Sequence, residues 1–415
     1  MLIIPSISIS EENQIHSYII ITTNAIVDES SILDVFIQHK ESLGYNVNLI
    51  TEDDYDNLKG SFPNLRPDRI RQWLINNYEE MNIEYVLLIG DPTPATYNSL
   101  IRIPNSKYSI PMKNFRDRMW FYYITGLPIP LALYENPSDY YYADLDSDWN
   151  SKTLLFCGDT CDYKSGNINL EAEVYVGRIP IYQTIDEVDT VLQKTIEYEN
   201  DTETSWRKSS LIACTPANDR VDFALFGDYI INQIMIPANF SYWRMYYKDS
   251  AYECEEPLNS TTFLNRWTEN QFGIVCFAAH GWTYGILPYI DYETVEQLND
   301  DYPSIVFLQS CFAGYPEEEN LGASLLKNGA IGVICASRTI WFKSNVTEFN
   351  QTYESGGLFY RFLEKTVQNY PIGKAFFQAK NEIEDIFPDD INLIYYFNLL
   401  RVNLYGDPSI TLLDG

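Results

Sequence analysis

A histidine and a cysteine each follow a short apolar run, and together they have the chemistry of a nucleophile and its base. His280 comes directly after residues 274–279, and Cys311 comes shortly after residues 305–308. Short apolar runs bounded by turn residues are typical of buried strands. If the two strands are parallel neighbours, their carboxyl ends lie side by side, at the edge where open α/β sheets bind ligands. A thiol and an imidazole meeting there could act as a cysteine nucleophile with its base.

Other candidates for these two roles fit less well. The chain has three histidines; His16 lies in a polar N-terminal segment, and His39 falls on the exposed side of a predicted helix. Ser310 would point the opposite way from Cys311 on a pleated strand, and no second histidine is left to serve it. Taken singly, a histidine or cysteine at a strand end is more often an inert core residue. The hypothesis therefore depends on the pairing of His280 with Cys311.

The composition is that of a folded protein with an acidic surface. The chain has 415 residues, 46% of them hydrophobic, which is enough for a sizeable core and for two domains or subdomains. Its formal net charge of −30 argues against a nucleic-acid or anionic-membrane partner, because like charges repel. The favoured interpretation of this charge is a well-solvated surface, which would also attract a cationic peptide.

The sequence shows no segment that would place the chain in or across a membrane. No run approaches the ~20 apolar residues that span a bilayer. The N-terminus lacks the basic region and the small-residue cleavage site of a secretory signal. We therefore expect a cytoplasmic location, unless the chain is a processed mature form.

The first part of the chain alternates between strand and helix patterns. Apolar runs at residues 18–22, 46–50 and 85–89 predict strands, and helical spacing at residues 31–43 and 68–78 predicts the helices between them. A βαβαβ beginning of this kind indicates a parallel sheet covered by helices.

We expect an N-terminal arm at residues 1–16, an N-terminal α/β subdomain at 17–203 and a second subdomain at 204–415. The polar stretch before residue 206 marks the boundary between the two. Regular patterning fails at about residues 92–170, where prolines interleave with aromatics for part of the way, and we interpret this segment as an irregular insertion.

The second subdomain repeats the alternation. Besides the two central strands, its predicted strands are at residues 210–214, 242–246 and 331–336, with a closing strand pair at 402–412. Its predicted helices are at residues 222–235, 261–269, 321–328, 357–368 and 373–386. The first subdomain ends with a predicted strand at residues 174–179 and a predicted helix at 184–198.

An acidic loop carries carboxylates at alternate positions, Asp144, Asp146 and Asp148. Such spacing suits an oxygen-seeking cation such as Ca²⁺. Counted from Asp144, however, Trp149 stands where an EF-hand has glycine and Leu155 where it has glutamate. The favoured interpretation is a solvated acidic loop, with a structural calcium site as the alternative. More distant ligands for such a site would be Asp159, Asp162, Glu171 or Glu173.

Five segments of the chain, in order, resemble landmarks of a known family. Residues 277–281 (FAAHG) and 308–314 (LQSCFAG) resemble the histidine and cysteine motifs of the gingipain-type cysteine peptidases, peptidase family C25, which are relatives of caspases, legumain and separase. Residues 85–91 (YVLLIGD), 174–178 (VYVGR) and 405–409 (YGDPS) are similar to further landmarks of that family. The resemblance extends over about residues 17–413.

The resemblance implies an α/β fold of two side-by-side α/β/α subdomains with mainly parallel sheets, the second of them caspase-like. It implies Cys311 as the nucleophile and His280 as the general base or acid. The backbone amides of Gly281 and Cys311 would form the oxyanion hole. No cofactor is expected for catalysis.

One member of the family's site has no direct counterpart. Gingipains place a glutamate just after the strand that matches residues 211–214, where it can orient the histidine. Here Asn218 and Asp219 stand near that place. Either of them could be the third member, or the chain could operate with a Cys-His dyad.

The family's preference for basic residues implies an acidic pocket. By resemblance, Asp222 and Asp228 are candidates for its carboxylates and Trp341 for its aromatic wall, because a desolvated carboxylate pairs strongly with a cation. The alternative, given equal weight, is that both aspartates lie on a solvated helix face.

Our leading hypothesis is a cysteine endopeptidase that hydrolyses protein or peptide substrates after Arg or Lys. The alternative is a catalytically silent family member that serves as a peptide-binding or scaffold module. A nucleotide-binding protein is disfavoured, since no glycine-rich phosphate loop follows any predicted strand.

Overall fold

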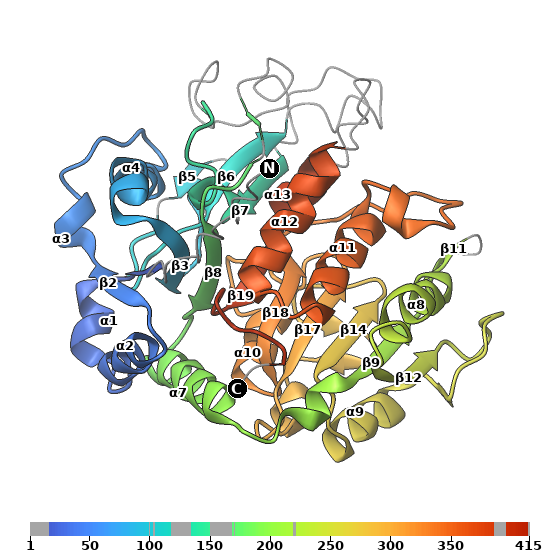
Figure 1. Cartoon of the computed structure of the whole chain (residues 1–415). Helices are drawn as coiled ribbons and strands as arrows, with labels where there is room; N and C mark the ends of the chain where they lie inside the picture. The colour runs from blue at the N-terminus through green and yellow to red at the C-terminus, as the bar shows by residue number, and fades with distance from the viewer. Residues whose placement is uncertain are drawn as a thin grey trace, which may run out of the picture.

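The computed structural model describes residues 16–98, 100–102, 104–117, 134–149, 168–169, 171–218, 221–385 and 396–413. Within these residues the chain is organised around an 11-stranded sheet with helices on both faces (Figure 1). The strand order is β13-β12-β9-β14-β17-β18-β19-β8-β3-β1-β2. Only the β18–β19 pair of this sheet is antiparallel among the described pairings. The predicted mixed α/β fold with a mainly parallel sheet is thus confirmed.

The strands come from both halves of the chain. The N-terminal half supplies β1 (Ser17–Ile21), β2 (Asn46–Ile50), β3 (Ile83–Gly90) and β8 (Tyr175–Pro180). The C-terminal half supplies β9 (Ser209–Cys214), β12 (Ser241–Tyr246), β13 (Glu256–Pro257), β14 (Ile274–Ala278), β17 (Ser304–Gln309), β18 (Ala330–Ala336) and β19 (Val402–Gly406).

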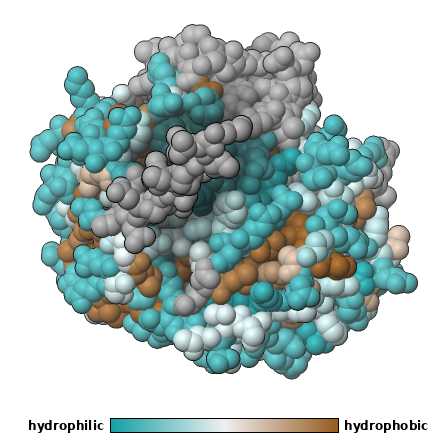
Figure 2. Space-filling view, viewed as in Figure 1, coloured by the Kyte–Doolittle hydropathy of each residue, from teal (hydrophilic) through white to brown (hydrophobic). Residues whose placement is uncertain are grey.

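Alternate residues of the strands feed two separate cores, one on each face of the sheet. The first face is covered by α3 (Glu52–Tyr55), α4 (Leu65–Met81), α8 (Ala224–Ile230), α11 (Ser355–Val367), α12 (Ile372–Asp385) and α13 (Tyr396–Arg401). The second face is covered by α1 (Asn24–Glu29), α2 (Leu33–Ser42), α7 (Asp186–Asn200), α9 (Ser260–Glu269) and α10 (Leu321–Lys327). Hydrophilic residues dominate the surface in Figure 2, in keeping with the net charge of −30.

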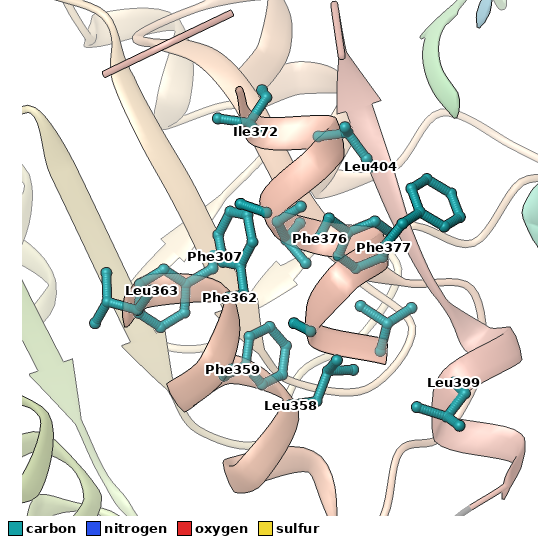
Figure 3. Close-up of a cluster of buried hydrophobic side chains, with 14 of the residues drawn as sticks. Phe307, Leu358, Phe359, Phe362, Leu363, Ile372, Phe376, Phe377, Leu399 and Leu404 are labelled. Atoms are coloured by element: carbon teal, nitrogen blue, oxygen red, sulfur yellow. The ribbon is translucent and has the colours of Figure 1, made fainter. Parts of the chain in front are cut away.

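Aromatic rings fill the first core beneath the central strands (Figure 3). Phe307 of β17 lies 5.7 Å from Phe359 and 6.3 Å from Phe362, both of α11, measured between ring centroids. Phe362 in turn lies 6.2 Å from Phe376 of α12. Large rings in such contact bury much apolar surface at little entropic cost, so they fix α11 and α12 on the sheet and with them the level at which β17 ends.

The two halves of the chain are joined by β19 and β8, which pair in parallel. A buried ion cluster lies beside this junction. The Lys40 ammonium of α2 is 2.6 Å from carboxylate oxygens of both Glu199, in α7, and Asp407, just after β19. The Tyr18 hydroxyl of β1 donates to Asp407 at 2.8 Å. Asp407, in the YGDPS segment, is thus the acceptor that holds elements from both halves of the chain together. The domain boundary predicted near residue 203 stays a prediction.

Some predicted elements differ from the structure. The closing strand pair predicted at residues 402–412 is wrong, because only β19 is a strand there. Pro408 has no N–H for a ladder, and the Asp407 carboxylate accepts instead from the Ser409 backbone N–H at 2.9 Å. Sequence patterning also missed α13. The helix predicted at 222–235 continues beyond α8 as a π-helical turn, Ile231–Met235.

The segment predicted to be an irregular insertion contains short hairpins where it is described. These are β4 (Thr96–Asn98) with β5 (Leu100–Arg102), and β6 (Lys113–Asp117) with β7 (Tyr134–Ser138). Among the helices in the described ranges, none has both the length and the apolar character needed to cross a bilayer.

The ion cluster around Lys40 leads to a stability prediction. Lys40→Ala should lower the free energy of unfolding by about 3–5 kcal/mol, because it leaves the buried Asp407 carboxylate without its cation. Lys107→Ala is the matched control: Lys107 is 58% exposed in its pair with Glu29, and loss of a surface pair costs about 0–1 kcal/mol. Urea unfolding followed by circular dichroism would measure both, and equal small losses would contradict the role given to Lys40.

Candidate active site

The register between β14 and β17 brings His280 and Cys311 to one level of one sheet edge. The two strands are parallel, with Ala278 opposite Gln309. His280 and Cys311 each lie two positions beyond these paired residues. The strand alternation places Ala278 in the first core, and Cys311 also packs against that core. His280 and Cys311 therefore lie at the same end of neighbouring strands. If the alternation of side chains is continued beyond the strand ends, both positions fall on the side of the first face.

The chain turns sharply after Cys311. Phe312 has a φ of 59°, a left-handed conformation that a bulky residue adopts only when its surroundings hold it there. Its backbone N–H donates to the Arg338 carbonyl at 3.2 Å, and the Gly314 N–H donates to the Ala336 carbonyl at 2.9 Å. The turn is thus fixed against the strand β18 and the residues after it, and it leaves the Cys311 side chain half-buried at the strand end.

His280 is exposed and is oriented by a backbone carbonyl. Its Nε2 lies 2.7 Å from the carbonyl oxygen of Ala217, in the short strand β10 (Pro216–Asn218). Because a carbonyl only accepts, Nε2 carries the proton, and the lone pair of the neutral ring is on Nδ1. His280 can therefore act as a base through Nδ1.

Asn218 and Asp219 were the predicted third members of the site. The structure places the Ala217 carbonyl at the histidine, with Asn218 the next residue along β10 and exposed. Asp219 lies outside the described residues. A backbone acceptor has no side-chain signature, and so the sequence could not reveal it.

Gly281 packs directly on the cysteine loop. A Cβ at this position would lie 2.6 Å from the Cβ of Ser310 and 2.8 Å from the carbonyl oxygen of Cys311, so only glycine fits. Ser310 is 1% exposed, which removes it as an alternative nucleophile. Among the described residues, the backbone N–H groups of Gly281 and Cys311 have no hydrogen-bond acceptor.

The surroundings of the Cys311 thiol disfavour its thiolate form. Burial raises its pKa above the ordinary value, opposed by the backbone contact with Ile340 and by the positive charge of Arg401. The thiol donates a long hydrogen bond to the Ile340 carbonyl oxygen, at 3.8 Å. Since the thiolate is the reactive form of a cysteine, reaction at this sulfur would need a base at the same sheet edge.

A cavity of about 790 Å³ opens beside this edge on the first face, a size typical of ligand-binding pockets. Gln309, two residues before Cys311, lies in its wall, as do Pro216 and Asn218 on either side of the carbonyl that orients His280. Three carboxylates and one ammonium line it: Asp222, Asp249, Glu354 and Lys343. The charge balance of the cavity favours a cationic occupant.

The sequence profile of peptidase family C25 matches residues 11–413 of the chain. The chain belongs to peptidase family C25. The predicted resemblance to gingipain-type peptidases is confirmed, and family membership supports a cysteine peptidase. No curated protein matched the chain by sequence.

The fold is similar to that of the Arg-specific cysteine proteinase gingipain R (RGPB). The TM-score against that crystal structure is 0.64, with 14% sequence identity, and the match covers 96% of this chain and 79% of the other. At this identity the likeness shows the fold alone.

Of the three residues predicted for a specificity pocket, the structure places one in the cavity of this C25 chain. Asp222 lines it and accepts from the Ala224 N–H at 2.9 Å and from the Ser250 hydroxyl at 2.6 Å. Asp228 is not part of the lining: it is 3.3 Å from the guanidinium of Arg244. Trp341 is not part of the lining either, and its neighbour Phe342 lies there instead.

Glu354 is a cavity residue that sequence reasoning missed. It is 1% exposed, and its carboxylate accepts from the Gly356 N–H at 2.8 Å and from the Thr352 hydroxyl at 3.1 Å. Burial raises its pKa, opposed by these hydrogen bonds. Its one sequence signal, an acidic residue before a helix, is that of an N-cap and does not by itself point to a pocket.

The acidic loop forms a compact carboxylate cluster. Oxygens of Asp144, Asp146 and Glu173 lie within 4.8 Å of one another; Asp148 is not part of the group, and the predicted distant ligands Asp159 and Asp162 lie outside the described residues. Asp144 is fully buried, and its Oδ2 has no hydrogen-bond partner within the part of the chain that the structure describes, while its Oδ1 lies 3.9 Å from the Arg71 guanidinium. Burial raises the pKa of Asp144 to about 6 and that of Glu173 to about 7. An orphaned buried oxygen among hard oxygen donors fits a Ca²⁺ ion.

The raised pKa of Cys311 leads to a prediction about its reactivity. Alkylation of Cys311 by iodoacetamide should be slow at pH 7 and should still be rising above pH 9, because burial disfavours the thiolate. Peptide mass spectrometry would follow the labelling of each cysteine. Cys254, also half-buried, is the internal control for reagent access, and rapid labelling of Cys311 at pH 6 would instead show a preformed thiolate–imidazolium pair.

Proposed function

We propose that this chain is a cysteine endopeptidase that cleaves peptide bonds after Arg or Lys. The observation that carries the proposal is the β14–β17 register, which brings an imidazole and a half-buried thiol to one edge beside an acidic cavity. Among the described residues, the Nδ1 atom of this imidazole has no hydrogen-bond partner. A protein or peptide is the expected substrate.

The reaction follows from these positions. His280 Nδ1 takes the thiol proton, and Cys311 Sγ attacks the carbonyl carbon of the scissile bond. The N–H groups of Gly281 and Cys311, which lack other acceptors, stabilise the resulting oxyanion. The intermediate collapses with cleavage of the C–N bond, and Nδ1 returns its proton to the departing amine. Water, deprotonated by Nδ1, then hydrolyses the thioester and releases the acid product and the thiol.

The Ala217 carbonyl has two roles in this scheme. It fixes the tautomer by accepting from Nε2–H, and its partial negative charge stabilises the imidazolium that forms when Nδ1 is protonated. A neutral carbonyl does this less strongly than a carboxylate would. The chain therefore works with a Cys-His dyad oriented by its own backbone.

Asp222 is the residue we assign to recognition of a basic P1 side chain. Its carboxylate is held in place by Ala224 and Ser250 and lies in the wall of a cavity where carboxylates outnumber ammonium groups. Phe342 supplies apolar wall for the aliphatic part of an Arg or Lys side chain. Asp228 is paired with Arg244 and is left out of this assignment.

The alternative remains a catalytically silent C25 member that binds peptides. The raised thiol pKa and the lack of a described carboxylate at His280 are the observations in its favour. A peptidyl acyloxymethyl ketone separates the two: an active peptidase is labelled at Cys311, and Cys311→Ala abolishes the label. A wild-type chain that binds the peptide but takes no label would establish the alternative.

The charge of Asp222 should control substrate choice. Asp222→Asn should lower kcat/KM for a fluorogenic Arg substrate by about 30-fold to 4,000-fold, because an unpaired cation in a cavity costs about 2–5 kcal/mol. Asp228→Asn is the matched control and should change kcat/KM little. A peptide panel cleaved only after acidic or apolar residues would remove the basic specificity.

We propose further that Asp144, Asp146 and Glu173 hold a structural Ca²⁺ ion. The ion would neutralise the negative charge of these three carboxylates. It would also give a partner to the Asp144 Oδ2 atom, which has none among the described residues. Asp144 also accepts from the Ser147 N–H at 3.1 Å, and the Leu145 N–H donates to Glu173 at 2.5 Å. The loop is thus already folded around the cluster, and the ion takes no part in the reaction.

The cluster should make stability depend on pH and on calcium. With chelator, stability should fall as pH rises from about 4 to 7, because the folded-state pKa values of Asp144 and Glu173, about 6 and about 7, lie above their ordinary values. Ca²⁺ should remove this fall and raise the Tm, most strongly above pH 7. Differential scanning calorimetry would measure both, with Asp148→Asn as the control and Asp144→Asn expected to lose the calcium effect. A Tm unaffected by millimolar Ca²⁺ at pH 8 would reject the site.

A further inference from the structure

Four large apolar side chains are exposed on one short segment that begins two residues after His280. Trp282 is 63% exposed, Tyr284 47%, Leu287 58% and Tyr292 40%. We call these four residues the aromatic patch. Scattered single apolar residues are normal on a protein surface, but several of them exposed on one short segment beside the candidate site point to an interaction site.

The segment that carries the aromatic patch is a hairpin, β15 (Gly285–Ile286) with β16 (Ile290–Asp291). Its inward residues, Ile286 and Ile290, are buried in the second core. The Leu321 N–H of α10 donates to the Thr283 carbonyl at 2.8 Å. The base of the hairpin is therefore fixed to the sheet and to α10.

Two further contacts order the exposed rings. The Tyr292 N–H donates to the Tyr284 carbonyl at 2.9 Å, and the rings of these two residues lie 5.7 Å apart. The Tyr284 hydroxyl donates to Glu318 at 2.6 Å. The two tyrosines of the patch are thus held in place before any partner binds, which reduces the entropy cost of binding.

The aromatic patch and the acidic cavity lie on opposite sides of the reacting pair. The hairpin packs into the core of the second face through Ile286 and Ile290. The cavity is lined by Phe223, Phe226 and Phe349, which belong to the core of the first face. A polypeptide lying across the sheet edge would therefore have one half at the cavity and the other at the hairpin.

The position proposed for the P1 side chain decides which half of a substrate reaches the hairpin. With the P1 cation in the acidic cavity on the first face, a chain that continues across the sheet edge brings its residues after the scissile bond to the second face, where the hairpin packs. The chain after His280 continues through Gly281, which packs on Cys311, directly into Trp282. Resting on the function proposed above, we propose that the aromatic patch is a subsite for apolar side chains on the C-terminal side of the scissile bond.

The charge of the chain argues for this occupant over a second copy of the chain. Two chains of net charge −30 repel each other, whereas a substrate segment joined to a P1 cation in the acidic cavity is brought to the patch by its own chain. Linked binding of this kind raises the effective concentration of the second segment.

Matched substrates test the proposal. Two internally quenched peptides would share the same residues up to a P1 Arg and differ after it, one continuing with Leu-Phe-Leu and the other with Ser-Gly-Ser. The wild-type protein should cleave the apolar peptide with a kcat/KM about tenfold higher, a ratio typical of small differences in apolar contact. The double variant Trp282→Ser, Leu287→Ser should bring this ratio to about one. Ile236→Ser, which alters a residue that is 52% exposed but far along the chain from the hairpin, should keep the wild-type ratio.

A second measurement reports on the same subsite independently of acylation. An Arg ester acylates Cys311, and the amine of an added dipeptide amide then competes with water for the thioester, forming a new amide bond as the thiol leaves. Leu-Phe-amide should capture several times more acyl group than Ser-Gly-amide in the wild type, and the two should be equal in the double variant.

Three results would overturn the proposal. The first is a double variant that loses rate on both peptides but keeps their ratio, which would assign the hairpin a role in positioning His280. The second is a wild-type dimer in sedimentation that becomes monomeric in the double variant, which would assign the patch to self-association. The third is a wild-type protein that cleaves the two peptides without a preference, which would end this inference alone. A folded wild-type protein that cleaves no peptide and forms no acyl-enzyme would instead end the proposed function and this inference together.

Discussion

The parallel pairing of β14 with β17 is the constraint on which the site depends. In a parallel ladder the side-chain direction alternates with a period of two, so a slip of one residue in the Ala278–Gln309 register would turn either the imidazole or the sulfur to the other face. Every residue of both strands is buried. The slip would therefore be costly, because it would move the side chains of a strand from one hydrophobic core into the other. The hydrophobic cores therefore set the positions of His280 and Cys311, although neither residue belongs to a strand.

Long-range contacts extend this order to the ends of the chain. The rings of α11 and α12 fix the level of β17, and the cluster around Lys40 fixes the segment after β19 to α2 and α7. A charge buried with its partners is poor evidence for stability but strong evidence for specificity of arrangement. Here it joins elements more than two hundred residues apart in the chain, which no short-range propensity could bring together.

The sequence allowed a prediction of the α/β alternation because fully apolar strands and capped helices have local signatures. It also allowed His280 and Cys311 to be paired, since each follows a strand. What it could not show was determined by the tertiary structure. The strand predicted after Asp407 is replaced by a turn in which the Asp407 side chain accepts from the Ser409 N–H, and the cavity wall includes Glu354 from a distant helix start. The partner of His280 is a main-chain atom, which no residue type marks.

The main-chain acceptor of His280 affects how the sequence of such a site can change in evolution. The acceptor at Nε2 is the carbonyl of Ala217, and every amino acid supplies the same oxygen. The hydrogen bond to the ring therefore depends little on the identity of residue 217, and a substitution at this position would still supply the acceptor. What must persist is the path of the polypeptide through β10, so insertions or deletions nearby would be far more damaging than substitutions.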